Sequence, residues 1–275
     1  TDRDEFVRNQ VRDKLVELGE DALPFLEIAT RGEDESLRIQ AHWVIKNILP
    51  KKLEEKFRLL AHRGLGKDID LEAGMMLVME FGYPDSDPNE CCKKLDDLAQ
   101  KLSKVLIPNS EPTEIIDTFT HFLFQEIGFK GNKENYHDPD NSFINKVLEN
   151  KTGLPITLSA LCVLLAKRLH LPIVGVGMPG HYIAKYSLPK ESIYFDPFHQ
   201  GRILTKNECI QIVQKLGYPF EEHFLSQATQ RETLIRMLNN LIQVYKNSNE
   251  IKKAEALAEY IKILLNPSKS QSSEK

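Results

Sequence analysis

The sequence predicts an α+β protein that is mostly helical, with a few short strands late in the chain. Apolar residues recur at helical spacing through most of residues 5–127 and again through residues 206–266. Between residues 172 and 205 the pattern changes to short runs rich in Val, Ile and Tyr, which are typical of strands. The most hydrophobic helical run, residues 152–171, directly precedes these strands, so we expect it to be the central helix.

The first fifty residues resemble a HEAT-type repeat. Helices are expected at 5–18, 22–30 and 34–48, and the run "VRDKLVELGEDALPFLEIATRGEDESLRIQAHWVIKNI" has the helix, turn and helix order of such repeats. A repeat of this kind cannot bury its apolar face alone and must stack on something. We therefore predict that residues 1–50 form a HEAT-like segment that serves as a cap or docking arm.

Further helices are expected on both sides of the predicted sheet. Those before it are 52–63, 69–81, 88–106 with Asp87 as its cap, and 110–129. A polar loop then leads into a short helix that Asn141 or Ser142 is expected to cap. After the sheet, residues 206–266 form a helical region ending in a hairpin that resembles a tetratricopeptide pair. The tail, residues 267–275, is polar and expected to be disordered.

The composition excludes several classes of protein. A formal net charge of −4 gives no electrostatic basis for binding nucleic acid or an anionic membrane. Apolar runs are too short to span a bilayer, and the opening "TDRDEFVRNQ" is unlike a signal peptide. The four cysteines show no paired spacing, which predicts reduced thiols, a cytoplasmic protein, and neither a metal nor another cofactor.

Three segments carry a more specific resemblance. "GNKENYHDPDNS", "GLPITLS" and "PGHYI" occur in this order, followed by "YFDPFHQGRILT". Together they resemble the SirB-type transglutaminase-like family, a bacterial group with tetratricopeptide-like C-terminal helices, over about residues 65–265. The resemblance implies a papain-like core, a central helix packed on a small antiparallel sheet, which we assign with its leading helices to residues 51–205.

The resemblance also implies a site built from Cys, His and Asp. His181 matches the histidine and Asp196 the aspartate that orients it, whereas Pro155 stands where active relatives have the cysteine. Cys162 lies two helical turns further on, about 10 Å along the axis, so we expect it to be a core residue. Thr157 is the nearest alternative nucleophile. Residues of the loop motif are expected to line the same pocket or brace the loop: Tyr136, Asp138, Asn141 and Ser142.

Two functions follow from this arrangement. The first is a noncatalytic transglutaminase-like module with a degenerate site, whose helical flanks bind a protein or peptide partner. The alternative is a hydrolase or transamidase acting on peptide or amide bonds. In that enzyme His181 and Asp196 would serve as base and orienter, with Thr157 or water as the nucleophile. The sequence favours the first function and leaves the oligomeric state open.

Overall fold

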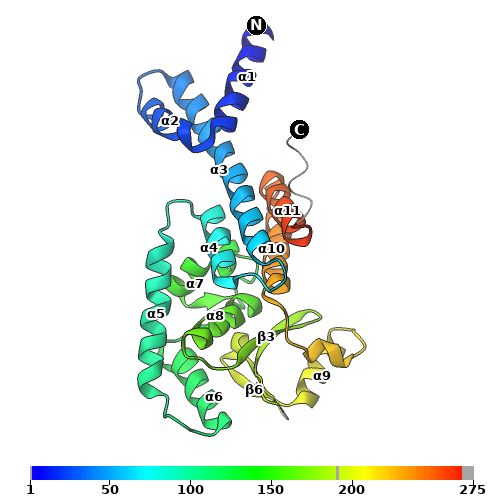
Figure 1. The fold of residues 1–275 in the computed structure, drawn as a ribbon. Coiled ribbons are helices and arrows are strands. Elements are labelled where there is room, and N and C mark those ends of the chain that lie inside the picture. The colour runs from blue at the N-terminus through cyan, green and yellow to red at the C-terminus, as the bar shows by residue number, and fades with distance from the viewer. Residues whose placement is uncertain (1, 190–191, 268–275) are drawn as a thin grey trace.

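The computed structural model describes residues 2–189 and 192–267 of the 275-residue chain. Three N-terminal helices begin the fold: α1 (Asp2–Leu18), α2 (Leu23–Thr30) and α3 (Glu35–Arg63). In Figure 1, α1 and α2 project from the rest of the molecule, and α3 connects them to it. Val16, Leu26 and Val44 belong to a hydrophobic cluster of their own. Most of the predicted tail, residues 268–275, lies outside the described residues.

The prediction of separate helices at 34–48 and 52–63 was wrong, because the single helix α3 takes the place of both. It runs without interruption through Pro50, so the boundary placed after residue 50 falls inside one helix. Packing on both sides of the proline accounts for this, because Ile48 belongs to the N-terminal cluster while Leu53 is buried in the main core. The Pro50 carbonyl also accepts a hydrogen bond from the Tyr260 hydroxyl at 3.1 Å. Tertiary contacts thus outweigh the helix-breaking tendency of proline here.

The main core surrounds helix α8 (Pro155–Arg168), the predicted central helix. Every residue from Pro155 to Cys162 is buried. The helices that precede α8 are α4 (Leu71–Gly82), α5 (Pro88–Val105), α6 (Pro112–Thr120), the π-helical η2 (His121–Glu126) that continues α6, the 3-10 turn η3 (Pro139–Ser142) and α7 (Ile144–Asn150). The predicted Asp87 cap of α5 is present, since its carboxylate accepts from the backbone N–H of Asn89 at 2.8 Å.

A four-stranded antiparallel sheet follows α8, in the order predicted. Its strands are β3 (Ile173–Met178), β4 (His181–Tyr186), β5 (Ile193–Asp196) and β6 (Arg202–Leu204). Tyr182 and Ala184 belong to the main core, whereas Ile183 belongs to a second cluster with Val213 of α9 (Lys206–Lys215). Successive side chains alternate between faces in a strand, so α8 and α9 cover opposite faces of this sheet. A short parallel pair, β1 (Lys130–Gly131) and β2 (Thr152–Gly153), lies before α8.

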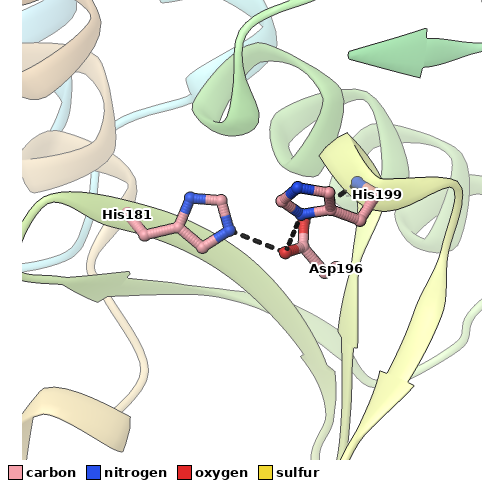
Figure 2. A group of neighbouring side chains, drawn as sticks. All are labelled: His181, Asp196 and His199. Atoms are coloured by element: carbon pink, nitrogen blue, oxygen red, sulfur yellow. Dashed lines mark hydrogen bonds and ion pairs between the residues drawn. The ribbon is translucent and has the colours of Figure 1, made fainter. Parts of the chain in front are cut away.

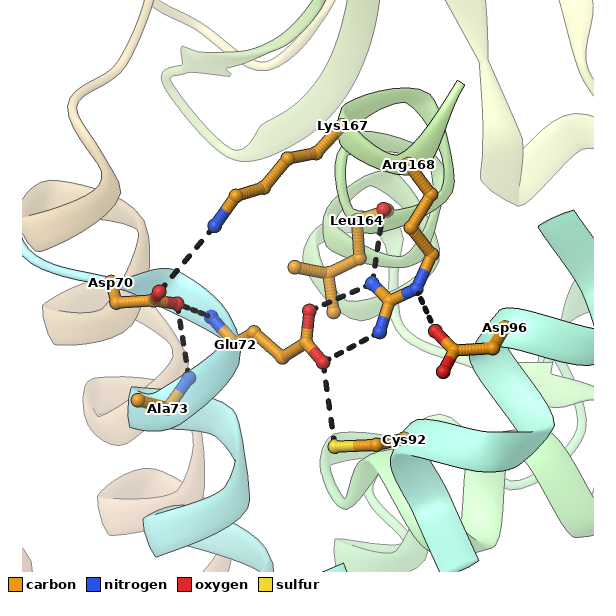
Figure 3. Close-up of polar contacts among 8 residues, drawn as sticks. All are labelled: Asp70, Glu72, Ala73, Cys92, Asp96, Leu164, Lys167 and Arg168. Carbon is orange, nitrogen blue, oxygen red and sulfur yellow. Dashed lines mark hydrogen bonds and ion pairs between the residues drawn. The ribbon is translucent and has the colours of Figure 1, made fainter. Parts of the chain in front are cut away.

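The C-terminal end of α8 is tied to two earlier helices by Arg168 (Figure 3). Its guanidinium donates two bonds of 2.7 Å to the Glu72 carboxylate on α4 and one of 2.6 Å to Asp96 on α5. Only 18% of each of the Arg168 and Glu72 side chains is exposed. Paired bonds of this kind have defined directions, so Arg168 fixes where α8 ends relative to α4 and α5.

The last two helices, α10 (Gln230–Asn247) and α11 (Ile251–Leu265), pack against each other as the expected hairpin. They also enter the main core, where Leu238 of α10 is fully buried. The rings of Tyr260 on α11 and Phe57 on α3 stack with centroids 4.5 Å apart. No helix in the described part of the chain has the length and apolarity that a membrane span needs.

Candidate functional site

The structure brings His181 and Asp196 together. His181 is the first residue of β4 and Asp196 the last residue of β5, its antiparallel neighbour. The His181 Nε2–H donates to Asp196 Oδ2 at 2.7 Å (Figure 2). The Asp196 side chain is 2% exposed and that of His181 is 12% exposed. The expected contact is therefore present, at the edge of the core.

Asp196 is held in place by the backbone that follows it. Its Oδ1 accepts from the N–H groups of Phe198 at 3.0 Å and His199 at 3.3 Å, which begins the short 3-10 turn η4 (Pro197–His199). Burial raises the pKa of Asp196, but the hydrogen bonds and charges of His181 and His199 outweigh burial and leave it below its ordinary value. The carboxylate is therefore ionised at neutral pH.

His199 is a third member of the site that the sequence reasoning missed. Its Nδ1 lies 2.8 Å from Asp196 Oδ2, so one carboxylate oxygen accepts from both imidazoles (Figure 2). The two rings are 5.9 Å apart, and the His199 side chain is 47% exposed. The signal was the spacing of Asp and His three residues apart in "DPFH". Among the described residues, His181, Asp196 and His199 form a group able to hold a metal ion, with ligand atoms within 4.8 Å of one another.

Pro155 is the first residue of α8, the helix that packs against β4 and η4. It is buried, carries no nucleophilic atom, and lacks the backbone N–H that another residue would offer there. No side chain caps this helix end, since Leu154 occupies the cap position. The helix therefore begins beside the site without a thiol or hydroxyl at its first position.

The other candidate nucleophiles lie inside α8. Thr157 and Ser159 are fully buried, and neither hydroxyl has a hydrogen-bond partner in the described structure. Thr157 is therefore not bonded to His181 and does not form a nucleophile–base pair with it. Cys162 is 1% exposed, and burial raises the pKa of its thiol, as expected of a core cysteine. No hydroxyl or thiol of the described residues is hydrogen-bonded to the His181 or His199 ring.

The loop motif before α7 is mainly a brace. The Asn141 amide donates to the carbonyls of Asn135 at 2.7 Å and Tyr136 at 3.2 Å, and its oxygen accepts from Asn132 at 3.0 Å. Asp138 caps the turn η3 by accepting from the Asp140 N–H at 2.9 Å. Asn141 thus ties the loop to itself and leaves no free amide group for a ligand.

The prediction that Asn141 or Ser142 caps the short helix was wrong. Helix α7 starts after Phe143, and neither Asn141 nor Ser142 caps it. Asn141 uses its amide within the loop instead, while the Ser142 hydroxyl is buried without a partner. Tyr136 is the loop residue that reaches the site, because its ring packs edge-on against Phe198 of η4 with centroids 5.9 Å apart. Its side chain remains accessible, since the residue is 41% exposed.

Arg236 of α10 supports the site from another direction. Its guanidinium donates to the His181 carbonyl at 2.9 Å and lies over the Tyr182 ring, 5.5 Å from its centroid. Burial lowers the pKa of Arg236, and no carboxylate of the described residues is bonded to it. The sequence offered no signal for this residue, because its role depends on how the C-terminal hairpin packs on β4.

The sequence of the chain is similar to those of several known proteins. Residues 89–239 match the transglutaminase-like superfamily. A UPF0162 protein of Xylella fastidiosa (strain 9a5c) is 33% identical over 205 residues, covering 70% of this chain and 71% of that protein. A UPF0162 protein of Pseudomonas aeruginosa is 26% identical over 182 residues, or 65% of this chain and 66% of that one. Human F-box only protein 21 is 28% identical over 142 residues, 49% of this chain and 22% of its own length. No solved structure matches significantly.

Proposed function

Because the chain belongs to the transglutaminase-like superfamily, and Pro155 stands where an active member has its cysteine, we propose that it is a noncatalytic protein-binding or scaffold module of the SirB type. The single observation that carries the proposal is the combination of an intact His181–Asp196 pair at 2.7 Å with a helix start that has no nucleophile. The pair can hold and orient a polar ligand group, but a covalent acyl intermediate has no atom on which to form.

The site has the features of a peptide-binding surface. The exposed ring of Tyr136 and the half-exposed imidazole of His199 both pack edge-on against Phe198. Aromatic side chains of this kind supply contact area at low entropic cost, and histidines and tyrosines add hydrogen bonds. An extended segment of a protein partner fits such a surface better than a folded domain, because the pair itself is largely buried.

The flanking helices support a scaffold role. Large apolar side chains are exposed on the N-terminal helices, among them Phe6, Val11, Phe25 and Ile28 at 52–74%. Exposed apolar side chains gathered on one segment are typical of an interaction surface. We propose that this HEAT-like segment and the tetratricopeptide-like hairpin contact protein partners. The similarity to F-box only protein 21 is consistent with a role in protein interaction. The four free cysteines are consistent with a cytoplasmic protein.

The test is a selection of binding peptides from a random display library on the full chain, followed by anisotropy titration of the best peptide. Tyr136→Ala is expected to weaken binding at least tenfold, about 1.4 kcal/mol. Tyr218→Ala is the matched control, since it also removes an exposed tyrosine ring but lies after α9, outside both proposed contact surfaces. Unchanged affinity in Tyr136→Ala would contradict the assignment of this surface. Cleavage of the bound peptide, or exchange of its amide for a labelled amine, would support the hydrolase or transamidase instead.

A further inference from the structure

Two imidazoles share one carboxylate oxygen in the site, which is more than a His–Asp pair needs. The orienting role of Asp196 is fulfilled by its bond to His181 alone. His199 adds a second ring nitrogen to the same oxygen. We propose that His181 Nε2, Asp196 Oδ2 and His199 Nδ1 are the ligands of a divalent first-row transition-metal ion such as Zn²⁺. This inference goes beyond the proposed function and does not depend on it.

The ligand set suits such an ion. Two neutral imidazoles and one carboxylate are ligands that zinc sites with an open position use, and related ions also accept this set. Bonds of about 2.0–2.1 Å to one ion place its ligand atoms roughly 3.0–3.4 Å apart. The two observed nitrogen–oxygen distances are 2.7 and 2.8 Å, and all three atoms lie within 4.8 Å of one another. The carboxylate oxygen is thus near enough to both nitrogens, and binding requires the half-exposed His199 ring to turn so that its nitrogen moves toward that of His181.

The proton balance is simple. Without the ion, each imidazole donates an N–H to Asp196 Oδ2. With it, the coordinating nitrogen must be unprotonated, so the proton moves to the other ring nitrogen. The His181 ring has no other hydrogen-bond partner in the described structure, and Arg236 bonds its backbone carbonyl rather than the ring. Both rings can change tautomer without breaking a further bond to the protein.

Hydrogen bonds from the backbone already orient the Asp196 carboxylate, as they do for carboxylate ligands in metal sites. Its second oxygen, Oδ1, accepts from the backbone N–H groups of Phe198 and His199. Hydrogen bonds behind a ligand orient it and are a regular feature of metal sites. The three ligands come from the start of β4, the end of β5 and the turn η4, so the sheet determines their spacing. The half-exposed His199 gives an ion a path from solvent.

The experiment is isothermal titration of the 275-residue chain with Zn²⁺, with the visible absorption of bound Co²⁺ as a second readout. We expect one ion per chain. His199→Ala keeps the His181–Asp196 pair and should weaken binding at least about 100-fold, because even loss of a supporting hydrogen bond costs about 10–100-fold. The matched control is His223→Ala, which removes an exposed histidine that is also paired with a carboxylate, Glu221, at 3.1 Å.

Further variants separate the site from other binding. Cys92→Ser removes the partly exposed thiol and should leave the affinity unchanged. Asp196→Asn, which keeps the shape of the side chain, should abolish the Co²⁺ spectrum while circular dichroism confirms the fold. His199 is half exposed, so its variant is expected to fold. Absence of Zn²⁺ binding by the wild-type protein, or equal affinity in the wild type and His199→Ala, would overturn the proposal.

Discussion

Thr157 provides a sharp test of whether the site retains a nucleophile. The residue is 0% exposed, lies two positions into α8 from Pro155, and its hydroxyl has no hydrogen-bond partner in the described structure. A buried hydroxyl without a partner costs about 1–3 kcal/mol. Thr157→Val keeps the branched shape and removes that hydroxyl. We expect the variant to raise the free energy of unfolding by about 1 kcal/mol and to leave peptide binding unchanged.

Urea denaturation followed by circular dichroism measures this effect, with an unchanged m-value as the check on two-state comparison. In a chain of this size the melting temperature should rise by about 2–4 °C. Thr233→Val is the matched control, because the buried Thr233 hydroxyl donates to the Thr229 carbonyl at 2.8 Å and lies 2.7 Å from the Tyr182 hydroxyl. That variant should lose about 1–3 kcal/mol. A loss of stability or of peptide binding in Thr157→Val would refute the reasoning, because the hydroxyl would then have a partner or a role.

Three further predictions concern the frame of the site. Arg168→Lys should lower the free energy of unfolding by about 1–2 kcal/mol in urea titrations, because an ammonium cannot make the paired bonds to Glu72. An unchanged free energy of unfolding would show that the paired bonds between Arg168 and Glu72 do not stabilise the fold. Cys162 should resist a thiol reagent at neutral pH in the native protein and react after unfolding, because burial raises the pKa of its thiol. Equal rates of Cys162 modification in the native and unfolded protein, measured by peptide mapping, would contradict its position in the core. Asn141→Ala should lower the free energy of unfolding by about 2–3 kcal/mol, because three side-chain hydrogen bonds are lost. Backbone amide hydrogen exchange in the loop should become faster in this variant. An unchanged exchange rate would contradict the role of Asn141 in bracing the loop.

The central helix and the sheet could be predicted because their signals are local. The run from Pro155 to Cys162 is apolar enough to identify a buried helix, and the change of period after residue 172 marks the strands. The order of one helix followed by four strands is therefore visible in the sequence, and the antiparallel arrangement came from the family resemblance. The resemblance selected His181 and Asp196, and they meet because neighbouring antiparallel strands place the start of one beside the end of the next.

The parts that could not be predicted depend on contacts between distant segments. Pro50 indicates a helix end by its own properties, but Ile48 and Leu53 pack into two different clusters and keep α3 continuous. Asn141 has the composition of a helix cap, yet its amide satisfies carbonyls of its own loop. His199 joins the site only because η4 turns its ring back onto the Asp196 carboxylate.

The most direct test of the central claim is to treat the native protein with a peptide bearing a thiol-reactive electrophile and to locate any adduct by mass spectrometry. The account predicts that the wild-type protein carries no adduct in α8, because position 155 has no thiol and Cys162 is buried. Any adduct at the partly exposed Cys92 should be the same in His181→Ala. Pro155→Cys, which places a thiol at the start of α8, is the positive control and should react in a manner that His181→Ala suppresses. Modification of the wild type at Cys162 that is lost in His181→Ala would contradict the account.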